Sequence, residues 1–249
     1  MLGAVVIALL SAGCAGSAAG NGSPTGHYGA LGTLIRIPVP TALRQLPLTN
    51  QYRRHVTLDS WPGRTVLVVP FLTLCQEECP LTTGNLIAVT RSLRADGATA
   101  RVQIIELSVD PVRDTPARLA AYAKLTGVNW QLVTTPPAEL HALAKFFGFF
   151  YTKVPEGNPP GIDWWTGRPL TYDVHHSDNY FVIDASGVER VVQIGSPDFH
   201  GHLKPQLESL LDGLGRQNLR NPPQPSWTPT DVLNALTVSV GQPLPAVSG

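Results

Sequence analysis

The alternation of short apolar runs with amphipathic segments constrains the fold of this chain more than any other feature of its sequence. Each apolar run is typical of a buried strand, and each is followed by residues with helical spacing. The expected strands are 65–69, 102–109 and 130–134, with a hairpin from 179–184 and 188–194. The expected helices are 75–93, 115–125, 137–147 and 203–214.

This order predicts one α/β domain with a central mixed sheet flanked by helices. Strand, crossover helix and parallel strand form the unit of such folds, and the closing hairpin adds antiparallel strands. The arrangement is that of a thioredoxin-like fold with two additions. One is an N-terminal hairpin from 46–49 and 55–58. The other is a Gly- and Pro-rich loop insertion at 155–169, which contains Trp164 and Trp165 and is either a partner-docking surface or a simple insertion.

The charge balance excludes a nucleic-acid partner. The chain has 18 Lys and Arg against 18 Asp and Glu, so its formal net charge is zero and no overall field attracts it to a polyanion. Charged residues make up only 14% of the sequence, whereas Gly and Pro number 23 each. This composition predicts a neutral surface with Pro-rich extensions.

Residues 1–19 have the composition of an export signal. A short apolar stretch is followed by small residues and Cys14, as in secretory signals. The surroundings of Cys14 resemble a bacterial lipobox, in which the cysteine is lipidated and begins the mature protein, and a plain cleaved signal is the alternative. The first interpretation predicts an extracytoplasmic lipoprotein, held by its lipid anchor at the outer face of the bacterial cell membrane.

The remaining chain divides into three parts by composition. Residues 20–40 are expected to form a flexible tether, because they begin with a stretch rich in Gly, Ser and Ala. Residues 41–216 are expected to form the thioredoxin-like domain. Residues 217–249 are expected to form a Pro-rich tail poor in core residues, in which only 230–237 suggests a short helix or strand.

Two cysteines follow the first buried strand. Cys75 and Cys79 are four residues apart, so on the first turn of a helix they share one face and can hold a metal ion or, with adjustment, form a disulfide. A helix N-terminus lowers the pKa of a nearby thiol, which makes Cys75 the more reactive sulfur. The spacing differs from the C-x-x-C of dithiol redox enzymes and favours metal. A structural disulfide, or two incidental buried cysteines, is the alternative.

A histidine is the expected third ligand. Thiolates select soft ions such as Cu(I) or Zn(II), and an imidazole completes a site with two sulfurs and one nitrogen. His175 and His176 precede the strand expected at 179–184, in a loop that approaches the start of the cysteine-bearing helix in a thioredoxin-like fold. The alternative is that both are solvated loop residues. His200 and His202 are expected on the surface.

Three ordered motifs resemble the Sco/SenC family of copper chaperones for cytochrome c oxidase. They are C-Q-E-E-C-P at 75–80, S-V-D-P-V-R-D-T-P at 108–116 and V-H-H-S at 174–177. The resemblance spans about 46–214. It implies a thioredoxin-like domain that binds one copper ion, Cu(I) or Cu(II), through Cys75, Cys79 and His176.

The same resemblance implies delivery of copper to the dinuclear Cu(A) site in subunit II of cytochrome c oxidase. Cys75 and Cys79 would be redox-active if they also reduced the cysteines of that site. The chain departs from the family at His175, where Asp is usual, so a second imidazole is available to bind or pass on the metal. Asp110 is expected to face the metal loop or a partner, and Asp114 and Thr115 are expected to cap a helix.

The leading hypothesis is therefore a copper-binding assembly factor and not a turnover enzyme. The main alternative is a thiol-disulfide oxidoreductase that acts on extracytoplasmic proteins, which would use Cys75 and Cys79 but not His176. Thioredoxin-like reductants usually have a cis-proline before the strand that faces the dithiol, and 176–179 contains no proline. A peroxiredoxin-type peroxidase would need Thr three residues before its cysteine, where this chain has Leu72.

Overall fold

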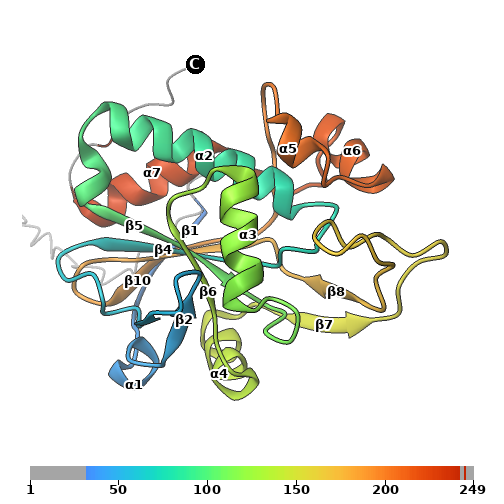
Figure 1. Ribbon diagram of the computed structural model, residues 1–249. Coiled ribbons are helices and arrows are strands. Elements are labelled where there is room, and N and C mark those ends of the chain that lie inside the picture. Colours follow the sequence, from blue (N-terminus) through green and yellow to red (C-terminus); the bar gives the residue numbers. More distant parts are fainter. Residues whose placement is uncertain (1–31, 242–243, 245–249) are drawn as a thin grey trace, which may run out of the picture.

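A computed structural model describes residues 32–241 and residue 244. Its centre is an eight-stranded sheet in the order β1-β10-β9-β4-β5-β6-β2-β3 (Figure 1). Strands β4, β5 and β6 pair in parallel and the others are antiparallel, so the expected mixed sheet is confirmed. The strands are β1 (Thr33–Pro38), β2 (Leu48–Asn50), β3 (His55–Val56), β4 (Thr65–Phe71), β5 (Val102–Ser108), β6 (Gln131–Thr134), β9 (Tyr180–Ile183) and β10 (Val188–Gln193).

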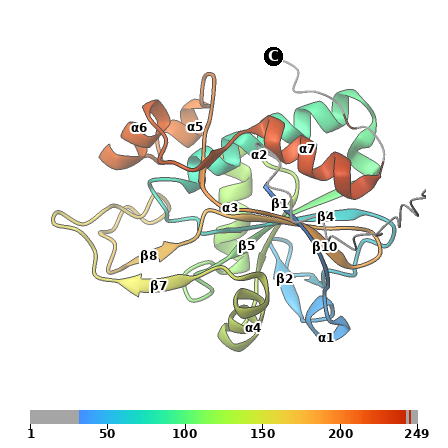
Figure 2. The ribbon, with the colours of Figure 1, turned by 180° about the vertical axis from the view of Figure 1, so that it is seen from behind.

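Helices cover both faces of this sheet (Figures 1 and 2). Helices α2 and α7 pack together over one face, and α4 covers the other, where the rings of Phe147 and Phe181 are 5.1 Å apart. Every residue of β4 and β5 is buried, as expected for central parallel strands that are covered on both faces. The helices are α1 (Thr41–Arg44), α2 (Cys79–Ala95), α3 (Pro116–Thr126), α4 (Pro137–Phe147), α5 (Pro205–Glu208), α6 (Gly213–Arg220) and α7 (Pro229–Val240), with a 3-10 turn at Ala98–Ala100.

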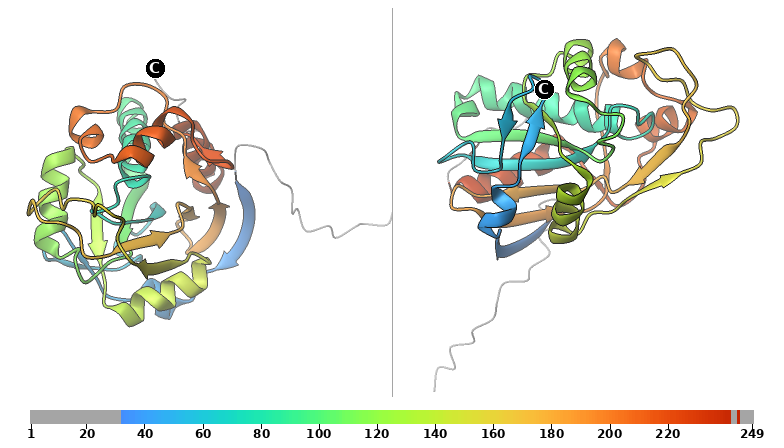
Figure 3. Two further views of the ribbon diagram at one scale, coloured as in Figure 1. Left: turned by 90° about the vertical axis from the view of Figure 1, so that its right-hand side faces the viewer. Right: turned by 60° about the horizontal axis from the view of Figure 1, so that its bottom comes forward.

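Two smaller sheets complete the architecture. Strand β11 (Ser196–Pro197) pairs in parallel with β12 (Ser226–Trp227). Strand β7 (Tyr151–Val154) pairs with β8 (Asp173–His176) at one end of the molecule, which faces the viewer in the left panel of Figure 3. The sequence predicts a loop around His176, but this histidine is the last residue of β8. Cross-strand bonds to β7 order the segment.

The expected helix at 75–93 begins later in the structure. Helix α2 starts at Cys79, with Pro80 in its first turn, and Cys75 lies in the preceding turn. The N-cap position belongs to Glu78, whose side chain makes no capping hydrogen bond. The two cysteines are therefore not on one helical turn, and their approach depends on the conformation of residues 75–78.

The prediction of a single helix at 203–214 is wrong. The chain forms α5 and α6 instead, because the Asp212 side chain accepts a hydrogen bond from the Gly215 backbone and starts a new helix. Helix α6 continues to Arg220, past the predicted end at residue 214.

The segment after residue 217 is not a tail poor in core residues. Helix α7 is closed by a capping box between Thr228 and Asp231 and packs on α2. Trp227 is completely buried, and its indole nitrogen donates to the backbone oxygens of Asp178 and Gly195. The many prolines suggest an extended tail. In the structure Val232 and Leu236 are four residues apart on α7 and buried, and this helix helps to cover the sheet.

The N-terminal part of the chain also differs from the expected tether. Residues 33–38 form β1, an edge strand paired with β10, so the tether does not reach residue 40. Cys14 and residues 1–31 lie outside the described residues. Within the described part, none of the helices combines the length and the apolar character needed to cross a membrane.

Candidate metal site

Two segments distant in sequence bring three side chains together at the end of the molecule that carries β7 and β8. Cys75 comes from the turn after β4, Cys79 from the first residue of α2 and His176 from the end of β8. Their candidate ligand atoms all lie within 4.8 Å of one another, so these residues form a candidate metal site. The three residues expected from the sequence thus meet in space.

The two sulfurs and the imidazole are already in contact. The backbone nitrogen of Cys79 is 3.4 Å from the Cys75 sulfur and donates to it. The Cys79 sulfur is 3.5 Å from His176 Nε2. Both cysteines are free thiols, so the structure does not contain the structural disulfide between them that was the alternative. Two sulfur donors and one nitrogen donor suit a soft ion such as Cu(I).

Hydrogen bonding orients the imidazole toward the sulfurs. His176 Nδ1 is 2.9 Å from the backbone oxygen of Ser177, and because a carbonyl oxygen only accepts, Nδ1 carries the proton. Asp178 Oδ1 lies 3.8 Å from the same nitrogen. Nε2 is thereby directed to the cysteines, as in metal sites where a backbone carbonyl fixes the ligating ring.

The charges of the site are arranged before any metal binds. A hydrogen bond with Cys79 holds the pKa of Cys75 well below its usual value, against the effect of burial and with help from His176. Burial raises the pKa of Cys79 well above its usual value. Burial alone would lower the pKa of His176, but the Cys75 thiolate, Asp178 and the Ser177 carbonyl raise it to about 10. Cys75 is the more acidic sulfur, as expected, through its neighbours and not through a helix that contains it.

Carboxyl groups near the cysteines titrate above their ordinary range. Burial and the Cys75 thiolate raise the pKa of Glu77 to about 7. Burial, Asp178 and Cys75 raise the pKa of Glu78 to about 8. Burial raises the pKa of Asp178 to about 6, although His176 lowers it. The site therefore has an excess of acidic groups that a bound cation would relieve.

The two residues expected to assist the ligands lie outside the three-residue cluster. The His175 side chain is 64% exposed, and its Nε2 is 3.9 Å from Asp173 Oδ2. Asp110 is buried and faces Arg113 and Tyr172, with the Tyr172 hydroxyl donating to it over 3.0 Å. An accessory role for His175 or Asp110 in metal handling stays a prediction.

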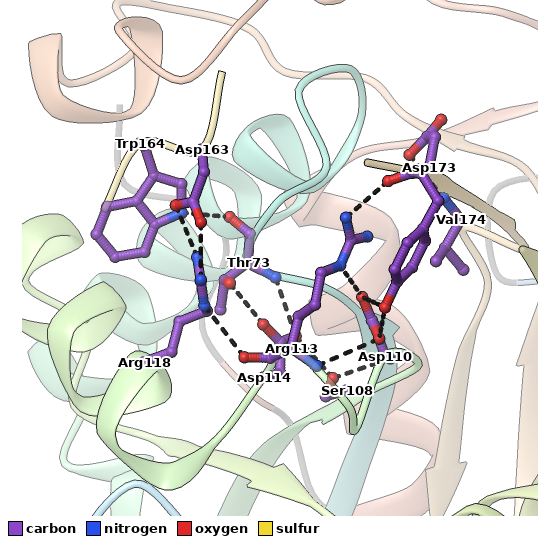
Figure 4. Close-up of polar contacts among 11 residues, drawn as sticks. Thr73, Ser108, Asp110, Arg113, Asp114, Arg118, Asp163, Trp164, Asp173 and Val174 are labelled. Atoms are coloured by element: carbon purple, nitrogen blue, oxygen red, sulfur yellow. Dashed lines mark hydrogen bonds and ion pairs between the residues drawn. The ribbon is translucent and has the colours of Figure 1, made fainter. Parts of the chain in front are cut away.

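Tyr172 ties the β8 segment to the loop after β5. The Arg113 guanidinium stacks on the Tyr172 ring at 3.7 Å, and Nη1 donates to the Tyr172 backbone oxygen over 2.6 Å. The Lys153 ammonium lies 3.6 Å from the same ring. Figure 4 shows Arg113 and Asp110 beside the strand that leads to His176. Tyr172, which directly precedes β8, therefore links Asp110 to the strand that carries His176.

A buried polar cluster holds the start of the cysteine loop (Figure 4). Asp114 accepts hydrogen bonds from the Thr73 backbone, the Thr73 hydroxyl and the Ser108 hydroxyl. The expectation that Asp114 caps a helix is wrong, because its carboxylate points to Thr73 in this cluster. The expectation for Thr115 is confirmed, since its hydroxyl accepts from the Arg118 backbone at the start of α3.

The Trp-containing loop is anchored on the same cluster. Arg118 makes a two-pronged ion pair with Asp163, with both distances 2.8 Å and both side chains about nine-tenths buried. Trp164 Nε1 donates to the backbone oxygen of Thr73 over 2.7 Å. The loop 155–169 thus includes a structural contact with the cysteine loop. Sequence reasoning missed Thr73, Arg118 and Asp163; the one available signal was the indole donor of Trp164, which needs an acceptor when buried.

Comparisons with known proteins agree with this geometry. A family model described as SCO1/SenC matches residues 41–197. A Stutzerimonas stutzeri protein named as copper-binding is 26% identical over 183 residues, which cover 74% of this chain and 78% of that protein.

Solved structures share the fold. Apo Sco1 from Thermus thermophilus, solved in solution, is 26% identical with a TM-score of 0.50, over 72% of this chain and 90% of that chain. Arabidopsis thaliana ScoI, solved with copper bound, is 21% identical with a TM-score of 0.52, over 74% of this chain and 99% of that chain. The fold is the thioredoxin-like fold of Sco proteins, as expected. Since the family model covers more than half of its length, the chain belongs to the SCO1/SenC family.

Proposed function

We propose that this chain is an extracytoplasmic copper-binding metallochaperone that assists assembly of the Cu(A) site of cytochrome c oxidase. The observation that carries the proposal is the meeting of Cys75, Cys79 and His176 within 4.8 Å. Family membership and the copper-binding name of the Stutzerimonas stutzeri relative support copper as the cargo. Subunit II of the oxidase is the client that the family resemblance implies.

The side chains suggest how the ion is taken up. The Cys75 thiolate is the first ligand, because its pKa is lowered in the metal-free chain. His176 then loses the proton on Nε2, and Cys79 loses its thiol proton, as each binds the ion. Uptake should therefore release protons from these two groups. A chaperone needs such a site to be preformed yet able to exchange its ligands.

The test compares two neighbouring histidines. His176→Ala should weaken Cu(I) binding more than about 100-fold, because it removes a ligand and not only an outer partner. The matched control His175→Ala changes an exposed side chain next to it and should weaken binding less than about tenfold. Competition against a Cu(I) chelator measures both, and circular dichroism checks that each variant folds. Equal losses would move the ligand role or divide it between the two imidazoles.

A thiol-disulfide oxidoreductase is the second candidate, favoured by the low pKa of Cys75 beside the free thiol of Cys79. The same variant separates the two functions. His176→Ala should fail to restore oxidase activity in cells that lack the protein, while its thiol exchange on a test disulfide persists. Full rescue by His176→Ala at limiting copper would favour the reductase.

The lipid anchor at Cys14 belongs to the same proposal. A Cys14→Ser variant should leave the membrane fraction and keep its copper affinity, because the anchor and the metal site are separate. Membrane association that persists in this variant would contradict lipidation at Cys14.

A further inference from the structure

A cavity of about 420 Å³ opens at the candidate metal site, and its wall is strongly acidic. Six carboxyl side chains line it, and none of its lining residues is Lys or Arg. The six are Glu77, Glu78, Glu156, Asp173, Asp178 and Asp212. We refer to this opening as the acidic mouth.

The charge of the acidic mouth is a local feature of a neutral chain. The chain has 18 acidic and 18 basic residues, so a third of its carboxyl side chains gather in one cavity. They come from separate segments, namely the cysteine loop, the loop after β7, the two ends of β8 and the start of α6, so a single polar helix face does not account for them. The distribution produces a negative potential at the opening although the net charge is zero.

Ligation of a soft ion does not require these carboxylates. Cu(I) prefers sulfur and imidazole, whereas carboxylates suit hard ions. Two of the six also have an oxygen without a hydrogen-bond partner in the described part of the chain, Glu78 Oε2 and Glu156 Oε2, and Glu78 is only 8% exposed. A buried polar atom without a partner points to a partner from outside.

Apolar side chains border the same opening. Phe150, before β7, is 59% exposed and Leu214, in α6, is 46% exposed, and both line the cavity. Exposed aromatic and aliphatic side chains next to charged groups are typical of protein interfaces, where the apolar residues contribute affinity and the charges contribute specificity and association rate.

We propose that the acidic mouth docks a protein partner whose metal-receiving cysteines lie in a surface rich in Lys and Arg. The transfer step rests on the proposed function, but the docking surface does not. As the bonds from Cu(I) to the two sulfurs and the imidazole of this chain break, two bonds to partner thiolates form, so the ion passes from three ligands to two. The two partner thiols release two protons as they bind, two of the freed ligands on this chain take up two, and the ion stays Cu(I) throughout.

The transfer test uses two peptides of equal length with the same Cys-x-x-Cys centre, one flanked by lysines and the other by glutamates. The rate constant for Cu(I) transfer from the loaded chain is measured by stopped flow at about 20 mM and about 500 mM salt. The lysine peptide should react at least about tenfold faster at low salt, and the difference should shrink at high salt. Equal rates for both peptides at low salt would overturn the proposal and leave the carboxylates to attract the ion itself.

A double variant locates the effect. Glu156→Gln with Asp173→Asn removes two charges from the acidic mouth, and should lower the low-salt rate with the lysine peptide by about tenfold. The matched control, Asp96→Asn with Glu208→Gln, removes two exposed charges outside the cavity and should change the rate less than about twofold. Equal effects of the two double variants would overturn the assignment to this surface.

A metal-free measurement separates failure of the docking surface from failure of the proposed function. Peptides with serine in place of cysteine are titrated into the metal-free chain, and binding is followed by fluorescence anisotropy at low salt. The lysine peptide should bind at least about tenfold more tightly than the glutamate peptide, and the acidic-mouth double variant should reduce this preference. No preference would overturn the proposal whether or not the chain binds copper.

Discussion

The loop from Thr73 to Cys79 is held from two sides by segments that work differently. On one side is the loop support, residues 161–164, where Trp164 donates to the Thr73 backbone and the Ile162 backbone accepts from Gln76. On the other side is the α6 support, residues 212–218, where the Asp212 backbone donates to the Gln76 backbone and Asn218 donates to Glu78. The loop support is fixed by a buried ion pair, and the α6 support by close backbone approach.

The two supports also differ in their relation to the family. The loop support lies inside the matched residues 41–197, whereas the α6 support lies beyond them. The candidate ligands Cys75, Cys79 and His176 are all inside. The loop that carries Cys75 and Cys79 is therefore held in place partly by a segment outside the match.

The largest expected effect comes from the ion pair of the loop support. Asp163→Asn leaves the Arg118 guanidinium buried without its counter-charge, and should lower the free energy of unfolding by about 3 kcal/mol or more. Asp59→Asn is the control, because the Arg44–Asp59 pair is more exposed and should contribute about 1 kcal/mol or less. Urea unfolding measures both. Similar losses from the two variants would show that the buried pair is not what fixes the loop support.

Repeating the urea unfolding at acid pH tests whether Asp163 is charged in the folded protein. Burial raises the pKa of Asp163, but the Arg118 guanidinium and the Trp165 and Thr166 backbones lower it more, so the net value is well below the ordinary one. A lowered folded-state pKa gives stabilisation that is present above the unfolded pKa of about 4 and is lost as pH falls through the folded value. Wild type and Asp163→Asn should therefore converge in acid. A constant difference down to about pH 2 would contradict the ion-pair explanation.

A smaller loss is expected from the α6 support. Gly215 lies against the backbone of the cysteine loop, so an added Cβ would overlap the backbone oxygen of Gln76. Gly215→Ala should lower the free energy of unfolding by about 1–3 kcal/mol. Gly213→Ala is the control on the same helix, where no atom lies within 4 Å of an added Cβ, and should be neutral or stabilising by up to about 1 kcal/mol. Equal effects at the two glycines would exclude close packing as the cause.

The fold was predictable where the signal is local. Helix α4 has the bounds expected from Leu140, Leu143 and Phe147, and β4 and β5 follow from runs rich in Val, Ile and Leu. Helix α7 was predicted only as a short helix or strand at 230–237, because the preceding prolines suggested a tail. Its capping residues Thr228 and Asp231 and its apolar spacing were present in the sequence, but whether such a short segment packs depends on a partner, α2, far away in the chain.

The candidate site was predictable to the level of the three residues that meet in it. The ordered motifs around Cys75, Cys79 and His176 single them out, because thiol and imidazole side chains are the donors that a soft ion prefers. The supports were not predictable, because Arg118–Asp163 and Glu78–Asn218 join residues 45 and 140 positions apart. Asp114 is also bonded to a residue distant in sequence. A carboxylate next to the start of a helix predicts a helix cap, and only the fold places Thr73 beside it.

The smallest effect expected from a single substitution is the loss of one indole hydrogen bond. Trp164→Phe removes the donor to the Thr73 backbone and should lower the free energy of unfolding by about 1 kcal/mol. Trp165→Phe is the control, because the Trp165 indole nitrogen makes no hydrogen bond within the described residues, and its ring is 46% exposed. Its loss should be less than about 0.5 kcal/mol. A loss from Trp165→Phe as large as that from Trp164→Phe would assign the effect to ring packing.

Combining Trp164→Phe with Gly215→Ala tests whether the two supports act on one loop. Their contacts on the loop, Thr73 and Gln76, are three residues apart. If one substitution displaces the loop, the contact that the other substitution affects is already weakened. The double variant should deviate from the sum of the single losses by about 0.5 kcal/mol or more. If the losses add within about 0.3 kcal/mol, the supports hold separate parts of the loop, and each can change without the other.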